Sequence, residues 1–301
     1  MVLNSVARNA ASATIESRFP KPVLSLARAI TLLALILLVY WRILGRLVQE
    51  WWFNPNFSHG FLVPIFVAFV IWQERDRLKQ IEIHPSWIGL GVIAGALGIL
   101  AIGVLGAEEF SSRASLVFVL AGLVIYFLGW SWFRALLFPL GCLFLMIPIP
   151  AILFNHLTLP MQLFASQFAN SLLSMLGVPV LREGNVLYLP TMALQVAEAC
   201  SGIRSLMALV TLSIVYGYLF EKRALRRFFL ALAALPIAII ANGLRIVGTG
   251  LVVQYVNPGL GEGFFHSFEG WVIFLISTLC LVGVHASFSG FDRVKRRISS
   301  R

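Results

Sequence analysis

The sequence predicts an all-α integral membrane protein with about eight transmembrane helices. Of its 301 residues, 59% are hydrophobic and only 12% are charged, and the mean hydropathy is +0.89. A soluble domain usually carries about 25% charged residues. A chain with so little polar surface cannot stay in water, but lipid can cover its apolar faces. The composition therefore excludes an ordinary soluble domain.

Eight stretches are expected as spans, because a helix needs about 20 largely apolar residues to cross the hydrocarbon core. They are residues 26–44, 57–73, 87–105, 115–130, 133–149, 201–220, 228–252 and 271–288, of which the second and the fourth are shorter than average. The expected organisation is a cytoplasmic basic segment over 1–25, a single polytopic membrane domain over 26–288 and a cytoplasmic basic tail over 289–301. The glycine-rich stretch GLGVIAGALGILAIG is interpreted as a glycine-packed membrane helix rather than a phosphate-binding loop.

The region before the sixth span has a different pattern. Residues 150–177 carry polar side chains among Leu, Phe and Met, namely Asn155, His156, Gln162, Gln167 and Asn170. This pattern predicts an amphipathic helix that lies in the interface or packs among other helices. In residues 178–196, β-branched residues, a Gly184-Asn185 turn and Pro190 predict a short hairpin.

The distribution of Lys and Arg predicts the orientation, because cytoplasmic loops carry the excess of positive charge. With the N-terminus in the cytoplasm, 17 of the 23 basic residues fall on the cytoplasmic side. The six exceptions, at the outer side or inside a span, are Arg42, Arg46, Arg113, Arg182, Arg204 and Arg245. We therefore expect both termini inside and residues 150–196 outside. The net charge of +10 comes from short runs between apolar segments, which argues against nucleic acid as a partner.

Cys200 is the main candidate for chemistry. It lies at or just before the start of the sixth span, where the helix dipole favours an anion, and Arg204 follows on the same helical face. A nearby cation and a helix N-terminus both raise the thiolate fraction of a cysteine. Cys142 and Cys280 lie inside apolar stretches and are interpreted as small buried hydrophobic residues.

Arg245 lies inside the seventh span, where a charge costs several kcal/mol and indicates a function. The structural alternative, for Arg204 as well, is an arginine that reaches the headgroups or pairs with a buried glutamate. Arg245 is suited to bind an oxyanion or a substrate carboxylate. Asn242, three residues earlier, shares its helical face and is a candidate hydrogen-bond donor.

A cysteine nucleophile usually needs a histidine as general acid or base. Three histidines share the predicted outer side with Cys200, namely His59, His156 and His266, and spacing alone does not choose among them. His266 has one local advantage, since it opens the span that directly follows the one carrying Arg245. The remaining two, His84 and His285, fall on the cytoplasmic side.

No metal or other cofactor is expected. The three cysteines form no CxxC pair, and the sequence contains no GxxxxGK[ST], HExxH or GxSxG motif.

Several motifs together resemble the exosortase family, which is related to the archaeosortases. They are VAEACSGIRSL, NGLRIVGTG and FHSFEGW, preceded in the same order by NPNFSHGFLVP and VPVLREGNVLYLP. The resemblance covers most of the chain, and the combination is specific although each motif alone is weak. It implies that the family's Cys, Arg and His fall on Cys200, Arg245 and His266.

The resemblance implies a membrane-embedded cysteine protease or transpeptidase in the bacterial inner membrane, linked to extracellular polysaccharide production. Its expected partners are exported proteins with a C-terminal Pro-Glu-Pro motif, a transmembrane helix and a basic tail, besides the lipid bilayer and, as further candidates, polysaccharide-pathway proteins. Cys200 would attack at the outer face, Arg245 would stabilise the oxyanion and His266 would protonate the leaving amine. Supporting roles are expected for Arg204, Asn242, Ser201, Glu198 and His59. Hydrolysis and transfer both stay open.

The alternative is a non-enzymatic multi-pass permease or polysaccharide-export component. A permease predicts polar residues through the full depth of the bilayer. Here the polar residues gather in the predicted outer half, which favours the enzyme.

The predicted orientation is testable with a reporter fused after Arg301. We expect a cytoplasmic reporter to be active there, because the positive-inside rule places the tail in the cytoplasm. Activity of a periplasmic reporter at the same position would contradict the assignment.

Overall fold

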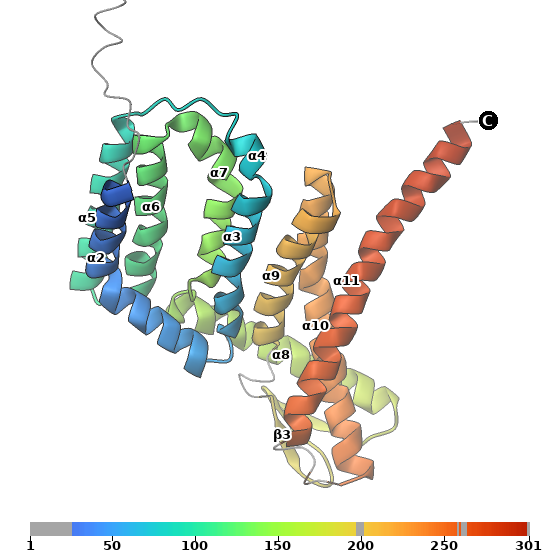
Figure 1. Ribbon diagram of the computed structural model, residues 1–301. Coiled ribbons are helices and arrows are strands. Elements are labelled where there is room, and N and C mark those ends of the chain that lie inside the picture. Colours follow the sequence, from blue (N-terminus) through green and yellow to red (C-terminus); the bar gives the residue numbers. More distant parts are fainter. Residues whose placement is uncertain (1–25, 197–201, 258, 260–263, 300–301) are drawn as a thin grey trace, which may run out of the picture. The chain divides into compact units, whose positions relative to one another are not determined.

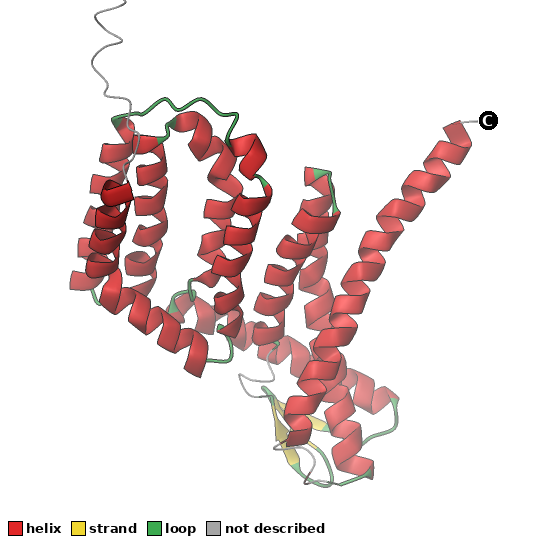
Figure 2. Ribbon diagram, viewed as in Figure 1, coloured by secondary structure: helices red, strands yellow, loops and turns green. Residues whose placement is uncertain are grey.

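Helices make up most of the described residues, and three short strands among them form one sheet (Figure 2). The computed structural model describes residues 26–196, 202–257, 259 and 264–299, with side chains described for 30–196, 202–257, 259 and 270–288. The longer helices are α2 (Leu26–Phe53), α3 (Leu62–Gln73), α5 (Ile88–Leu105), α6 (Glu109–Phe127), α7 (Trp130–Cys142), α8 (Ala151–Met175), α9 (Ile203–Phe220), α10 (Ala224–Tyr255) and α11 (Phe264–Ser299) (Figure 1). The shorter elements are η1 (Ser58–Phe61), α4 (Arg75–Leu78), η2 (Leu143–Met146), β1 (Leu181–Glu183), β2 (Val186–Tyr188) and β3 (Ala193–Gln195).

The prediction of an all-α membrane protein is confirmed, but the count of eight spans is not. Among the described residues, six helices are long and apolar enough to cross a bilayer, or seven if the broken pair Trp130–Met146 and Ala151–Met175 is one span. In the predicted span 57–73, η1 and α3 form one apolar helical segment, Ser58–Gln73, that is shorter than the six candidate spans. The predicted span 133–149 also ends early, because α7 tightens into η2 before Pro148 and Pro150.

The fourth span begins at Glu109 and not at residue 115 as predicted. The Glu108 carboxylate caps this helix, accepting hydrogen bonds from the backbone N–H groups of Phe110 (2.9 Å) and Ser111 (2.6 Å). Burial alone would raise the pKa of Glu108, but these bonds and the nearby Arg113 hold the pKa below its usual value. Arg113 in turn pairs with Glu109 one turn earlier. The sequence prediction left out this first turn because hydropathy counts Glu109 and Arg113 as charged residues and takes no account of their pairing.

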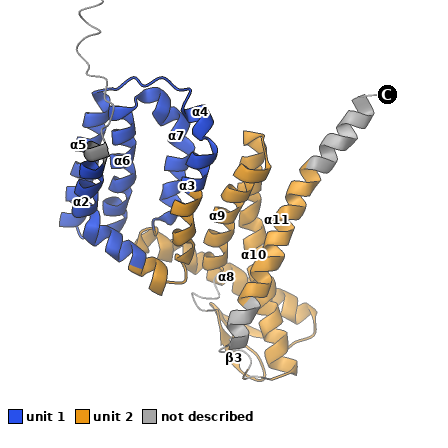
Figure 3. Cartoon of the chain, viewed as in Figure 1, with its two compact units in different colours: residues 1–48, 67–147 blue, residues 49–66, 148–301 orange. Residues whose placement is uncertain are grey.

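The chain divides into two compact units, of which unit 1 comprises Met1–Val48 and Val67–Ile147 (Figure 3). Its described core contains Tyr40 of α2, Ala96 and Leu100 of α5, and Leu116 and Val119 of α6. The Tyr40 hydroxyl and the Ser115 hydroxyl are hydrogen-bonded at 2.9 Å, so a buried polar pair is satisfied within this core.

Glycine allows α5 and α6 to approach closely. A Cβ on Gly89 would lie 2.3 Å from the Tyr126 backbone nitrogen, and one on Gly103 would lie 2.5 Å from Ser112 Oγ. Gly91, Gly95 and Gly98 of the same stretch would meet nothing within 4 Å. The interpretation of this stretch as a glycine-packed helix is therefore confirmed, and only some of its glycines make the contact.

Unit 2 comprises Gln49–Phe66 and Pro148–Arg301 (Figure 3). One core cluster joins α8, the sheet and the last turns of α10, and includes Leu173, Leu187, Val196, Ile246 and Val253. A second cluster joins α9, α10 and α11 through Leu209, Leu230 and Leu281. Helix α10 is therefore the element that α8, the sheet, α9 and α11 all pack against.

The predicted amphipathic helix and hairpin are both present, and the hairpin has a third strand. Helix α8 buries one face, which includes Phe154, Ala165 and Leu173. Strands β1 and β2 pair antiparallel with Glu183 opposite Val186, and Gly184 has the positive φ of +61° that this two-residue turn requires. Strand β3 adds to β2 with Leu194 opposite Leu187. Lipid-exposed sheet edges do not occur in the hydrocarbon, so the sheet marks an end of α10 outside it.

The close approach of α5 and α6 predicts a position-specific effect of alanine. We expect Gly89→Ala to lower the stability of the folded protein by about 1–3 kcal/mol or more, because the added methyl group meets rigid backbone. Gly91→Ala is the matched control and should have almost no effect. Thermal unfolding in detergent measures both, and equal melting temperatures for the two variants would contradict the packing described for α5 and α6.

Candidate active site

The candidate site is built on α10, where Asn242 is 2% exposed and Arg245 is 7% exposed. Glycines let α8 approach this part of α10: a Cβ on Gly243 would lie 2.5 Å from a Phe168 ring carbon, and one on Gly250 would lie 3.0 Å from Leu173. Ile246 and Val247 already belong to the cluster beneath the sheet. Arg245 therefore lies next to the residues of α10 that pack beneath the sheet.

The N-terminus of α9 meets Asn242. Gly202, the N-cap residue of α9, has a φ of +81°, and a Cβ there would lie 2.7 Å from the Asn242 side-chain carbon Cγ. Glycine is required at this position for two reasons: the positive φ disfavours other residues, and Asn242 leaves no room for a side chain. Cys200, Ser201 and Glu198 lie outside the described residues, which resume at Gly202.

The start of α11 passes next to Arg245. The guanidinium nitrogen Nη1 of Arg245 is 3.8 Å from the position of a Cβ on Gly270. His266 belongs to α11, four residues before Gly270, and positions four apart share one face of a helix. Its side chain is outside the described set.

Arg204 is held by a residue from a distant part of the chain. Its Nε donates a hydrogen bond to Asn56 Oδ1 at 3.3 Å, and Asn56 is 7% exposed. The sequence analysis did not select Asn56, although it lies within the NPNFSHG motif. A buried asparagine usually has a specific partner, and here the described partner is the arginine two residues after Gly202.

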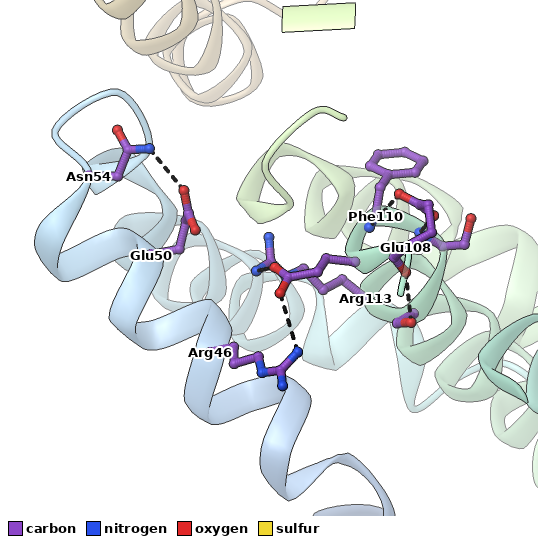
Figure 4. Close-up of polar contacts among 9 residues, drawn as sticks. Arg46, Glu50, Asn54, Glu108, Phe110 and Arg113 are labelled. Atoms are coloured by element: carbon purple, nitrogen blue, oxygen red, sulfur yellow. Dashed lines mark hydrogen bonds and ion pairs between the residues drawn. The ribbon is translucent and has the colours of Figure 1, made fainter. Parts of the chain in front are cut away.

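The segment that carries Asn56 is ordered by its own contacts. Asn54 Nδ2 donates to Glu50 Oε1 at 2.8 Å (Figure 4), and Asn54 Oδ1 accepts from the backbone N–H of Asn56 at 3.1 Å. Trp51 covers Gly60 so closely that a Cβ there would lie 2.3 Å from Trp51 Nε1. His59 lies in the same segment and is half-buried. The structure therefore brings His59 into the unit that contains Arg204 and Arg245.

The other histidines are placed differently. His156 is exposed on α8, and His84 lies in unit 1 with Nε2 3.1 Å from Glu82 Oε2. His285 Nδ1 is hydrogen-bonded to the Tyr216 hydroxyl at 2.9 Å, and its Nε2 lies 3.8 Å from Glu221 Oε2 at the connection between α9 and α10. This connection is at the opposite end of α10 from the sheet, so His285 is separated from Arg245 along the helix.

The described residues offer no obvious metal centre. Within the part of the chain described here, no three His, Cys, Asp or Glu residues come together in a group that could hold a metal ion. Cys142 is buried as predicted, whereas the prediction that Cys280 is buried is wrong. Cys280 lies on the exposed side of the apolar span Gly270–Phe288, where lipid is its natural surrounding.

These contacts bring the starts of α9 and α11 against Asn242 and Arg245 of α10 within unit 2. Arg204, which is hydrogen-bonded to Asn56, lies two residues after Gly202, and guanidinium groups such as those of Arg204 and Arg245 are suited to hold a carboxylate or a developing oxyanion. The class of protein is therefore a polytopic helical membrane protein with buried polar side chains on α10.

The chain belongs to the transmembrane exosortase family. The family model described as "Transmembrane exosortase (Exosortase_EpsH)" matches residues 51–283, which is more than half of the chain. This confirms the resemblance carried by the motifs, and the family implies a protease or transpeptidase kind of enzyme. No curated protein and no solved structure shows a significant match to the chain.

The contact between Gly202 and Asn242 predicts a difference between two glycines of equal backbone conformation. Gly177 has a φ of +80° and open space around it, whereas Gly202 has a φ of +81° and lies on Asn242. Alanine at either position loses about 1–2 kcal/mol for the left-handed conformation. We expect Gly202→Ala to lose about 1–3 kcal/mol more because of the clash.

Thermal unfolding of the two alanine variants in detergent measures this difference. Asn242→Ala added to Gly202→Ala should recover part of the extra loss, because it makes room for the methyl group. Equal losses at Gly177 and Gly202 would show that α9 does not rest on Asn242.

Proposed function

We propose that the protein is a cysteine protease or transpeptidase that cleaves the C-terminal sorting signal of exported proteins at the outer face of the bacterial inner membrane. The observation that carries this proposal is the convergence in unit 2 of three motifs separated along the chain. Gly202 of the cysteine motif contacts Asn242, and Gly270 of the histidine motif lies next to Arg245. In this proposal Cys200 is the nucleophile, Arg245 stabilises the oxyanion and His266 is the general acid.

We propose that Cys200 acts close to this convergence. Cys200 precedes Gly202 by two residues, and two residues of chain span at most about 7 Å. The start of an 18-residue helix favours an anion, and Arg204 adds a positive charge one turn along α9. Both effects favour the thiolate, which is the reactive form of a cysteine. Ser201, Glu198 and His59 are proposed to support the site.

The proposed reaction has two stages. The Cys200 thiolate attacks the scissile carbonyl carbon, and the carbonyl oxygen becomes an oxyanion stabilised by Arg245. The C–N bond then breaks, and the leaving amine takes a proton from His266. The resulting thioester is resolved by water in hydrolysis or by an acceptor amine in transfer.

The substrate proposed from the family has a Pro-Glu-Pro motif, a transmembrane helix and a basic tail. Such a helix would lie beside the enzyme in the bilayer, with its basic tail on the cytoplasmic side, where Lys and Arg gather. The motif would then reach the outer interface. The donor-rich side chains of the site suit the glutamate of that motif, since guanidinium groups bind carboxylates strongly. A link to extracellular polysaccharide production and its proteins is part of the same proposal.

The proposal predicts the loss of substrate processing in three variants. Cys200→Ala should abolish processing, and His266→Ala should lower its rate by about 10²-fold or more. Arg245→Lys should also lower the rate by about 10²-fold, because lysine keeps the charge but not the planar fork of donors. The readout is mass spectrometry of the C-terminus of a tagged substrate expressed with each variant.

Cys280→Ala is the matched control, since this exposed cysteine should be dispensable. Full processing by the Cys200→Ala variant would exclude the proposed nucleophile. Expression and melting temperature close to those of the native protein show that a processing defect is not a folding defect.

A further inference from the structure

A pocket in unit 1 has no part in the proposed reaction, whose residues all belong to unit 2. Helices α2, α5 and α6 enclose about 550 Å³ beside the turn between α5 and α6. This volume is in the range of small-molecule sites. Its lining combines three arginines, Arg42 and Arg46 of α2 and Arg113 of α6, with apolar residues of α2 and α5.

The charges of this pocket do not balance. Arg46 lies 3.4 Å from Glu109, and Arg113, whose side chain is only 4% exposed, pairs with the same carboxylate. Figure 4 shows Arg46 extending from α2 toward α6, where Arg113 lies. The Glu108 carboxylate is used to cap α6. Arg42 makes no hydrogen bond or ion pair with any residue of the described chain.

Three guanidinium groups therefore have one carboxylate among them, that of Glu109, because the Glu108 carboxylate already caps α6. Such an excess of positive charge favours an anion. It also accounts for three of the six basic residues that oppose the charge rule, because Arg42, Arg46 and Arg113 gather in this one place.

The apolar part of the lining restricts what kind of anion fits. Leu38, Trp41 and Val104 line the pocket and are 75%, 74% and 60% exposed, so they continue into the lipid-facing surface of the spans. The pocket lies where α5 ends and α6 begins, which is the level of the headgroups. A helical peptide is about 10–12 Å wide, so this volume would enclose about one turn of it. A headgroup with attached acyl chains fits this combination of basic and apolar lining residues.

We propose that this pocket binds the phosphate of an anionic phospholipid, with Arg42 and Arg46 as its outer contacts and the acyl chains along α2 and α5. Glu109, which pairs with both Arg46 and Arg113, competes with the phosphate for these arginines. The proposal does not depend on the proposed function, since it concerns a different set of residues.

The test uses the full-length protein in detergent, titrated with lipid and observed by native mass spectrometry. The probes are phosphatidylglycerol, phosphatidylcholine with the same acyl chains, and soluble glycerol phosphate. We expect phosphatidylglycerol to bind most tightly. The double variant Arg42→Gln, Arg46→Gln should raise its apparent Kd by about tenfold or more, since each arginine contributes to anion binding at the surface.

Two further variants make the result specific. The double variant Arg75→Gln, Arg77→Gln removes two exposed arginines of α4 in the same unit and should leave the Kd unchanged. Glu109→Gln should lower the Kd, because it releases Arg46 and Arg113 from their shared counter-charge. A loss of folding cannot produce such a gain in affinity.

Three results would overturn the proposal. Phosphatidylcholine could bind as tightly as phosphatidylglycerol, or the Arg42 and Arg46 variant could match the α4 control. Soluble glycerol phosphate binding as tightly as the lipid would show that the acyl chains contribute nothing, and the pocket would then be a site for free phosphate.

Discussion

The burial of one guanidinium group in a membrane-embedded helix is the constraint on which unit 2 depends. Arg245 is 7% exposed, and a charge removed from water is tolerated only where polar groups surround it. Helices α8, α9 and α11 and the sheet pack along α10 and exclude water from it. Glycines at 202, 243 and 270 mark where neighbouring elements come nearest to it. The close packing of these elements on α10 buries the charge and also brings the motifs of the family together.

The six basic residues that lie outside the predicted cytoplasmic segments fall into two groups of three. Arg42, Arg46 and Arg113 line one pocket in unit 1, and Arg182, Arg204 and Arg245 belong to unit 2. Arg182 has a structural role, since its Nη1 donates to the Gly184 carbonyl at 2.8 Å and so braces the β1–β2 turn. In each group the arginines therefore have either a hydrogen-bond partner within the protein or a pocket that could hold an anion. Their positive charges lie outside the predicted cytoplasmic segments because they serve these local contacts.

The features that the sequence predicted correctly depend on composition or on neighbouring residues. Composition and apolar stretches predicted a helical membrane protein, because lipid imposes the same requirement on every span. The Gly184-Asn185 turn and the amphipathic helix before it were also predicted, since both depend on neighbouring residues. The count of spans was not predicted, because the short apolar segment Ser58–Gln73 and the short α7 look like complete spans until their ends are known. The start of α6 was missed because a hydropathy scale counts Arg113 and Glu109 as two charges, although the two side chains neutralise each other.

The sequence by itself determined the class of protein, the family and the residues that carry its motifs. It could not determine which of those residues meet. Asn56 and Arg204 are 148 positions apart, and their hydrogen bond exists only because the chain folds back within unit 2. The contacts of Gly202 with Asn242 and of Gly270 with Arg245 likewise join different helices. Composition and local pattern are properties of neighbouring residues, whereas a site assembled from four segments is decided by how those segments pack.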